Sequence, residues 1–299
     1  CKMKKVLITT ISILFSTFTN AQYTKDINTN RPSSSMGAYS VSKGVFQLEG
    51  GFHYQNDEYH TEKKNVQNNL NLQVRYGEIW EQLEFVADFQ LANYQQTNFN
   101  YNHKATGFKQ VTVGAKYLLY DHYKYYVEKR NVYSWKANQR FKWKRLIPAV
   151  SVFVGANFNS SHNFYYPELP GIGLKTIVIA QQHLSKRFSI TYNFIGENLT
   201  DEAFTNYNYI VTASLGLNDK WSVFGEHQGV IDKKYKNTNI PLEKEAHLKG
   251  GLTYKLHPNM QIDAFAGTSL DNEPHKILAG LVLSWRNHKK YQFKDPTEM

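Results

Sequence analysis

Hydrophobic and polar side chains alternate at every second position over residues 67–91. The stretch "LNLQVRY" (70–76) places Leu and Val on one face and Asn, Gln and Arg on the other. After a short break at 77–80, "LEFVADFQL" (83–91) repeats this pattern, with Glu84 and Asp88 on the polar face. Successive side chains of a strand point to opposite sides of a sheet. The pattern therefore predicts two antiparallel strands joined by a hairpin turn.

The same alternation recurs along most of the chain, and no segment carries a sustained helical period. Regular instances cover 46–55, 111–119, 150–158, 188–194, 208–217, 248–256 and 277–286, and less regular ones lie near 172–183, 221–231 and 260–270. Together they predict an all-β protein of about twelve strands of roughly ten residues, the length that a tilted membrane strand needs.

The predicted connections are of two kinds. Short turns fall at 77–80, 185–187, 218–220 and 257–259, and long polar loops fall at 57–65, 92–107, 159–171, 199–206 and 232–246. Alternation of short and long connections is typical of outer-membrane barrels. The alternative, a soluble β-sandwich, has no reason to sort its loops by side, and its Greek-key crossovers would break the hairpin order.

We therefore predict a transmembrane antiparallel up-and-down β-barrel, with the apolar face toward lipid and the polar face lining an interior. The opposite orientation would place Arg75 or Lys249 in lipid, at about 2–4 kcal/mol each near the midplane.

The N-terminal sequence predicts export. A cationic start, the apolar run 6–18 and small residues before position 22 are typical of a cleaved signal peptide, here 1–21. The alternative, a membrane helix, would need about 20 apolar residues. Export and the barrel pattern together predict the bacterial outer membrane. We expect 22–44 to be a periplasmic or lumen segment and a candidate plug, 45–286 the barrel, and 287–299 a polar tail.

Charge is concentrated in one segment. Without the three leader lysines the formal charge falls from +10 to +7, and residues 121–145 alone carry eight basic and two acidic side chains. This distribution argues against a nucleic-acid-binding surface. Aromatic and basic residues alternate near 133–144, which predicts a hairpin beyond the membrane with its turn near 137–140. Such a hairpin suits anionic lipid headgroups or an acidic protein partner, although an aromatic girdle with solvated charges is an equal alternative. The interface candidates are Lys136, Arg140, Lys142, Trp143, Lys144 and Arg145.

Catalytic chemistry finds little support in the sequence. The only cysteine is Cys1, so the exported chain has no disulfide, thiolate site or cysteine nucleophile. The eleven histidines lack zinc-site spacing, and no nucleophile elbow or phosphate loop occurs. We predict no enzyme, no metal and no cofactor.

Several motifs, taken in order, resemble the outer-membrane transporter family linked to the meta-pathway of phenol degradation. The resemblance implies an outer-membrane β-barrel of the Bacteroidetes type. The motifs include "TNRPSSS", "KGVFQLEGGFHY", "VRYGEIWEQLEF" and "TVGAKYLLY", then "WSVFGEHQG", "LKGGLTYKLHPNMQIDAFAGTSL" and "ILAGLVLSWR". The resemblance spans about residues 28–286. It implies a twelve-strand-like barrel that acts as a transporter, with a substrate that is poorly defined across the family.

The resemblance also marks individual positions. Those within matching motifs are Arg31, Pro32, Glu49, Arg75, Gly77, Lys116, Glu226 and Asp263. With other charges on the polar face they give the lumen candidates Glu49, Arg75, Glu84, Asp88, Lys116, Glu226, Lys249 and Asp263. These charges could constrict a pore, or they could be satisfied interior salt bridges that hold the barrel's shape.

Two segments depart from the family pattern, the basic stretch 121–145 and the tail after Arg286. Two function classes follow. The first is a channel or transporter for small solutes, among them hydrophobic or aromatic ones. The second is a non-conducting structural or accessory barrel that docks a periplasmic or outer-membrane protein through its basic hairpin. The expected partners are thus outer-membrane lipid, small-molecule solutes or such a protein.

Overall fold

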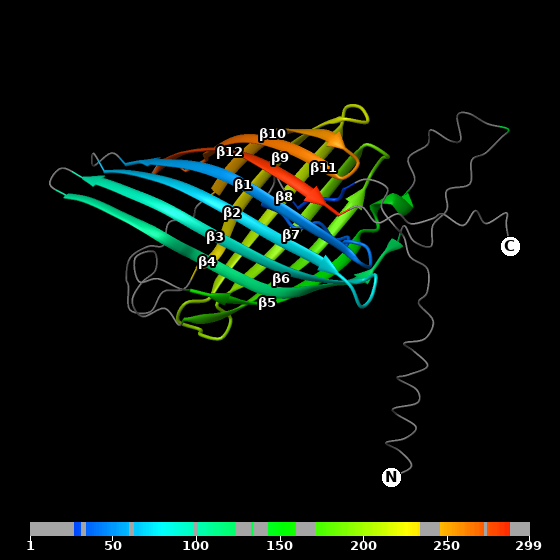
Figure 1. The fold of residues 1–299 in the computed structure, drawn as a ribbon, viewed down its shortest axis with the longest axis horizontal. Coiled ribbons are helices and arrows are strands. Elements are labelled where there is room, and N and C mark those ends of the chain that lie inside the picture. The colour runs from blue at the N-terminus through cyan, green and yellow to red at the C-terminus, as the bar shows by residue number, and fades with distance from the viewer. Residues whose placement is uncertain are drawn as a thin grey trace, which may run out of the picture.

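In the described part of the chain, twelve antiparallel strands pair in sequence order and close into a barrel, seen from the side in Figure 1. The computed structural model describes residues 27–30, 34–59, 63–98, 101–122, 133, 143–159, 171–233, 246–271 and 274–287. The strands are β1 (Val45–Glu58), β2 (Lys64–Gly77), β3 (Leu83–Asn98), β4 (Tyr101–Tyr120), β5 (Ala149–Phe158), β6 (Ile172–His183), β7 (Phe188–Glu197), β8 (Asn206–Gly216), β9 (Trp221–Lys233), β10 (Ala246–His257), β11 (Met260–Ser269) and β12 (His275–Arg286).

The barrel closes where β1 pairs with β12, with Leu48 opposite Trp285. Every neighbouring pair is antiparallel, so the connectivity is up-and-down throughout. The predicted fold class, an all-β closed antiparallel barrel of about 12 strands, is confirmed.

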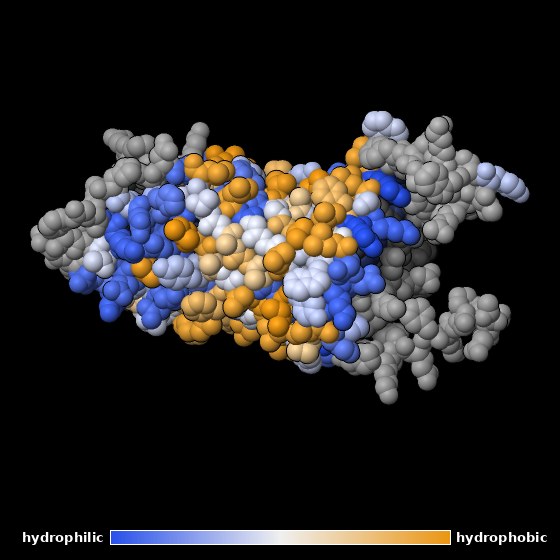
Figure 2. Space-filling model, turned by 90° about the horizontal axis from the view of Figure 1, so that it is seen from above, coloured by the Kyte–Doolittle hydropathy of each residue, from blue (hydrophilic) through white to orange (hydrophobic). Residues whose placement is uncertain are grey.

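The two faces of the wall differ as the alternation predicts. In β2, Leu70 is 56% exposed on the outside, whereas its neighbour Asn71 is 5% exposed and faces inward. Figure 2 shows the result on one side of the barrel, where a band of hydrophobic surface is flanked by hydrophilic residues at both ends. Aromatic side chains also occur at the short-turn end of the outer wall, where Trp221, the first residue of β9, lies near Tyr254 with ring centroids 4.6 Å apart. Such a belt suits a membrane interface.

The barrel has two unlike ends. Short turns lie at one end, between β2 and β3, β6 and β7, β8 and β9, and β10 and β11. We call this the short-turn end and the other the far end. The predicted long loop at 92–107 is wrong, because β3 continues to Asn98 and β4 begins at Tyr101. This stretch is polar because the paired strands project past the apolar band, as the long β3 and β4 in Figure 1 illustrate. Strict alternation of short and long connections therefore fails at this hairpin.

β4 ends and β5 begins at the short-turn end, and 28 residues, 121–148, connect them. Its described C-terminal part, Trp143–Leu146, is a 3-10 helix. The predicted basic hairpin is therefore wrong over 143–145, where a tight helical turn leads into β5. No helix of the described ranges is long and apolar enough to cross a membrane.

Several predictions concern residues outside the described ranges. These are the signal peptide 1–21, Arg31 and Pro32, the hairpin residues Lys136, Arg140 and Lys142, and the tail from 288 onward.

Candidate functional site in the barrel lumen

A segment before β1 runs through the barrel interior at the short-turn end. We call it the strap and define it as the described residues 27–30 and 34–44. Its start is tied to the turn between β10 and β11, where the Ile27 amide donates to the Pro258 carbonyl over 2.8 Å. Its end leads directly into Val45, the first residue of β1. The strap is not a strand of the sheet, and it meets the wall mainly through side chains that face inward.

Four charged side chains from adjacent strands form a buried cluster beneath the strap. Arg75 on β2 lies between two carboxylates, with 3.1 Å from its Nη1 to Glu49 Oε1 and 2.6 Å from its Nε to Glu84 Oε1. Lys116 on β4 completes the set, with its Nζ 3.3 Å from Glu84 Oε2. The side chains of all four residues are 0% exposed. We call Glu49, Arg75, Glu84 and Lys116 the charge quartet; its two positive and two negative charges balance.

The cations of the quartet also bind strap carbonyls. Arg75 Nη1 donates to the Asn28 carbonyl over 2.7 Å. Lys116 Nζ donates to the Gly37 and Tyr39 carbonyls over 3.0 and 2.9 Å. Burying a charge costs several kcal/mol unless its hydrogen-bonding capacity is satisfied. The strap therefore supplies the acceptors that let these cations lie inside the barrel.

The carboxylates of the quartet bind strap amides in the same way. Glu49 accepts the Asn30 amide at 3.1 Å, and Glu84 accepts the Val41 amide at 2.7 Å. Charged acceptors make stronger hydrogen bonds than neutral ones. One set of four side chains thus fixes both ends of the strap to the β1–β4 wall.

The middle of the strap is bound to the opposite wall. The Ser34 amide donates to Glu226 on β9 over 2.9 Å, and the Ala38 amide donates to Gln181 on β6 over 2.9 Å. Between them, Asn193 on β7 accepts the Met36 amide at 2.6 Å and donates to the Met36 carbonyl over 2.9 Å. β1 and β7 are six strands apart in a ring of twelve. The strap therefore crosses the lumen from one wall to the other.

An apolar cluster inside the barrel packs against the strap. Met36 and Ala38 lie against Phe153 on β5 and against Ile177 and Ile179 on β6, all nine-tenths buried or more. The sequence analysis missed this inner apolar wall. Its signal was the irregular pattern of 172–183, where apolar residues occupy both faces of the strand.

Two cavities lie on either side of the strap. The larger, about 330 Å³, opens toward the far end and is partly lined by strap residues Asn30, Ser34 and Met36. The smaller, about 190 Å³, lies at the short-turn end and is lined by hydroxyls and amides such as Thr191. Ser35 lines both cavities. The strap is therefore a partition across a polar lumen.

The remaining lumen candidates lie outside the charge quartet. Glu226 is fully buried and pairs with Lys249, whose Nζ lies 3.6 Å from Glu226 Oε1 and donates to Ser34 Oγ over 2.9 Å. Asp88 lines the larger cavity and accepts Gln73 Nε2 at 3.2 Å.

Asp263 on β11 is fully buried and accepts Gln261 Nε2 at 2.8 Å. The candidates therefore form several groups rather than one constricting ring.

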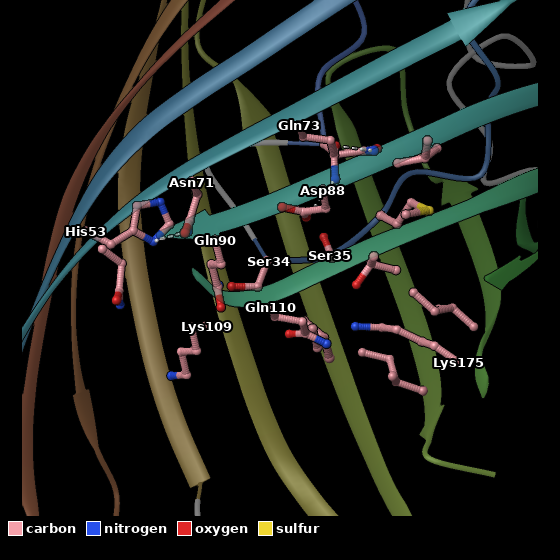
Figure 3. Close-up of a pocket in the computed structure, with 18 of the residues that line it drawn as sticks. Ser34, Ser35, His53, Asn71, Gln73, Asp88, Gln90, Lys109, Gln110 and Lys175 are labelled. Carbon is pink, nitrogen blue, oxygen red and sulfur yellow. Dashed lines mark hydrogen bonds between the residues drawn. The ribbon is translucent and has the colours of Figure 1, made fainter. Parts of the chain in front are cut away.

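Two lysines of the larger cavity escaped the sequence analysis. Figure 3 shows Lys109 and Lys175 projecting into the cavity, with His53 and Asn71 on the wall opposite Lys175. Lys175 Nζ lies 2.7 Å from Glu197 Oε1. Lys175 belongs to an irregular run, and Lys109 falls in the segment predicted as a loop.

The described interface candidates lie on the outer surface near the short-turn end. Trp143 is 77% exposed, and Lys144 is also exposed. Arg145 donates to the Leu184 carbonyl over 3.3 Å, which ties this connection to the turn between β6 and β7. Within the described residues, no group of three or more His, Cys, Asp or Glu is placed to hold a metal ion.

Several solved structures align with most of this chain at low sequence identity. The translocator domain of autotransporter NalP from Neisseria meningitidis is 7% identical, with a TM-score of 0.49, and the match covers 96% of this chain and 95% of that one. The KdgM porin is 9% identical with a TM-score of 0.46, covering 80% and 99%. The CymD monoaromatic hydrocarbon channel is 11% identical with a TM-score of 0.43, covering 84% and 90%.

Sequence comparison is more specific. No curated protein sequence matches at a significant level. The profile of one family matches residues 29–286, from within the strap to the end of β12. The chain belongs to the family described as "Putative MetA-pathway of phenol degradation".

Proposed function

We propose that this protein is an outer-membrane channel for small solutes and that the strap holds its lumen closed in this structure. The observation that carries the proposal is the partition itself. Polar cavities of about 330 and 190 Å³ lie on the two sides of the strap. A lumen with a solid core would not leave two cavities separated by a single segment that belongs to no strand pair.

The bonding of the strap suits a gate. Its anchors on the far wall, Gln181, Asn193 and Glu226, act through single side chains rather than through β-pairing. Each such hydrogen bond contributes about 0.5–1.5 kcal/mol net, and one to a charged group about 1.5–3 kcal/mol. None of the twelve strand pairs includes the strap. Its middle can therefore leave the lumen while the wall stays intact.

The rest of the proposal concerns placement and cargo. We infer export by the cleaved leader 1–21, with the short-turn end in the periplasm, as is usual for outer-membrane barrels. The charge quartet then lies at the periplasmic side of the partition, and Asp88 and Lys249 lie nearer the external side. The mixed polar and apolar lumen wall suits small solutes, including aromatic ones.

The test is single-channel conductance in planar bilayers. The release variant carries Gln181→Ala, Asn193→Ala and Glu226→Ala. A matched control carries Ser189→Ala, Thr191→Ala and Ser222→Ala, which line the smaller cavity from β7 and β9. We expect the wild type and the control to be mostly closed and the release variant to show a large steady conductance. Liposome swelling with small sugars should follow the same order.

Two results would contradict the proposal. A folded release variant without conductance would show that removing the strap opens no path. A wild type that already conducts as well as the release variant would show that the strap is not the barrier.

A second candidate function is supported by the exposed Trp143 and the basic connection around it. An accessory barrel would dock an acidic partner there. Replacing Lys136, Arg140, Lys142, Lys144 and Arg145 by Gln should then abolish co-purification of that partner and leave conductance unchanged. Loss of conductance without loss of a partner would count against docking.

A further inference from the structure

Two adjacent turns at the short-turn end carry exposed basic residues. The turn between β6 and β7 has Lys186 and Arg187, and the turn between β8 and β9 has Lys220 beside Asp219. We call Lys186, Arg187 and Lys220 the basic rim; all three residues are exposed. These two turns have three cations against one carboxylate, so this part of the barrel end is positively charged.

Hydrogen bonds hold the two turns of the basic rim side by side. Arg187 Nη1 donates to the Leu217 carbonyl over 3.3 Å, and the Arg187 carbonyl accepts the Gly216 amide at 2.7 Å. Arg145 ties the preceding connection to the turn between β6 and β7 in a similar way, through the Leu184 carbonyl. A guanidinium carries five N–H donors in a planar fork that matches a phosphate. One bond to a carbonyl therefore orients Arg187 and leaves it able to donate to an anionic group.

The basic rim borders the membrane-facing wall. Leu215 and Trp221, which lie on the outer face next to these turns, are both 42% exposed. Trp221 also forms the aromatic pair with Tyr254 described above. Tryptophan and tyrosine on the outer wall of a barrel mark the level of the lipid headgroups. The cations of the rim therefore lie near the level of the lipid phosphates, directly beyond side chains that face acyl chains.

The turn between β2 and β3 provides a contrast at the same end of the barrel. It exposes the large apolar side chains Ile79 and Trp80, at 52% and 53%. Its charged residues, however, are Glu78 and Glu81, and residues 77–82 include no cation. A ligand that needs apolar and cationic contacts together would therefore select the basic rim and avoid this turn.

We propose that the basic rim binds the headgroup of an anionic phospholipid. The phosphate accepts hydrogen bonds from Arg187 and pairs with Lys186 and Lys220, while the acyl chains lie on the outer wall at Leu215 and Trp221. Basic side chains at a membrane surface attract anionic lipids, and salt weakens this attraction. A lipid suits the rim better than an acidic protein, because the cations border an apolar wall. The inference goes beyond the proposed channel, since it requires only that the barrel lies in a membrane.

The test is native mass spectrometry of the purified full chain in detergent with equimolar dioleoyl phosphatidylglycerol and dioleoyl phosphatidylethanolamine. The two lipids share their acyl chains and differ in the net charge of the headgroup. We expect the barrel to retain phosphatidylglycerol about tenfold more than phosphatidylethanolamine at low salt. This ratio should fall as ammonium acetate rises from about 50 to about 500 mM. Excess glycerol 3-phosphate should not displace the lipid, because the free anion makes no contact with the apolar wall.

Two triple variants locate the site. The rim variant carries Lys186→Gln, Arg187→Gln and Lys220→Gln, and its lipid ratio should fall to about twofold or less. The matched control removes the same charge from the far end and should keep the ratio of the wild type. Its substitutions are Lys63→Gln, Lys64→Gln and Lys104→Gln.

A converse variant tests the contrast between the turns. Glu78→Lys with Glu81→Lys places two cations beside Ile79 and Trp80, so the turn between β2 and β3 acquires both features of the basic rim. We expect this variant to retain about one more phosphatidylglycerol per barrel than the wild type. An unchanged number would show that cations beside exposed apolar residues do not suffice, and would count against the site.

Several results would overturn the lipid site. These are equal retention of both lipids by the wild type, an equal loss of selectivity in the rim variant and the far-end control, or displacement of the lipid by glycerol 3-phosphate, which would assign the rim to a free phosphate. Loss of an acidic protein partner from the rim variant, with lipid selectivity unchanged, would assign the rim to protein docking. Conductance decides the proposed function separately. A barrel that selects phosphatidylglycerol but stays silent after strap release keeps the lipid site and loses the channel, and a conducting barrel without lipid selectivity does the reverse.

Discussion

The two ends of the lumen hold their charges in different ways. At the short-turn end, Arg75 and Lys116 are fully buried and are surrounded by carboxylates and strap carbonyls. Toward the far end, Lys175 and Lys249 have side chains that are 18% and 11% exposed, and they border a cavity of about 330 Å³. The short-turn end resembles a polar protein core, and the far end resembles a ligand pocket.

This difference teaches that a charge inside a barrel does not by itself mark a solute path. A buried ion pair is costly to desolvate and is strongly destabilising when only one partner is removed. A lysine that still meets water can exchange its partner for a solute. The strap contributes to this difference, because it covers the charge quartet completely and leaves Lys175 and Lys249 partly exposed.

The largest expected effect comes from breaking the charge quartet. Arg75→Met leaves the Glu49 and Glu84 carboxylates without their shared cation, which should lower the free energy of unfolding by about 3–5 kcal/mol. Urea titration of the barrel in lipid vesicles measures the change. The double variant Arg75→Met, Glu49→Gln should recover part of the loss. An unfolding midpoint equal to that of the wild type would show that the buried charge quartet does not stabilise the barrel.

A smaller effect is expected where the strap meets the far wall. Asn193→Ala leaves the amide and carbonyl of Met36 without their partner, at a cost of about 1–3 kcal/mol for a buried group. The same urea titration should show this loss, together with brief channel openings in bilayer recordings. Thr191→Ala, on the same face of β7 and in the smaller cavity, is the control. Identical recordings from Asn193→Ala and Thr191→Ala would show that Asn193 does not anchor the strap.

A more modest change should follow a reversal of charge in the larger cavity. In the background of the release variant, Lys109→Glu should shift the cation-to-anion permeability ratio toward cations by about threefold, because water partly screens a lumen charge. Reversal potentials in a salt gradient report it. The control is Lys104→Glu, because Lys104 lies on the same strand but is exposed. It should leave the permeability ratio close to that of the release variant. A shift of equal size in both variants would mean that Lys109 does not face the solute path.

The smallest effect should come from an ion pair in water. Lys64 Nζ lies 2.9 Å from Glu58 Oε1 at the far end, with side chains 50% and 55% exposed. Lys64→Gln should leave the unfolding midpoint unchanged within error, since exposed pairs contribute little. A loss of unfolding free energy comparable to that of Arg75→Met would contradict the distinction between fully buried and exposed ion pairs.

Sequence reasoning reached the wall of the barrel but not its contents. The alternation correctly placed Leu70 on the outer face and Asn71 on the inner face of β2, because a two-residue period follows directly from strand geometry. It missed that Lys109 points into the lumen. The pairing of β4 with β3 shifts by one residue at Lys109, which forms a β-bulge. In the sequence, such an interruption of the alternation looks like the end of a strand. The sequence analysis also treated 92–107 as a loop, because polar residues beyond the apolar band carry no lipid-facing pattern.

The partners of the strap were out of reach for another reason. Met36 meets Asn193 across the lumen, 157 residues away. No local pattern encodes such a contact between a segment outside the sheet and a strand on the far side. The polar face predicted which side chains point inward, and only the closed barrel brings them to the strap.

The bonding pattern of the strap has a consequence for assembly. Asn30 is held on β1 and Met36 on β7, and the two anchors are six positions apart in the sequence. Six residues of extended chain reach at most about 20 Å. The diameter of a barrel grows with its number of strands, so an extra hairpin would carry the second anchor away from the first. The segment that closes the lumen thus acts as a ruler, which forms its full set of bonds only in a barrel of the correct circumference.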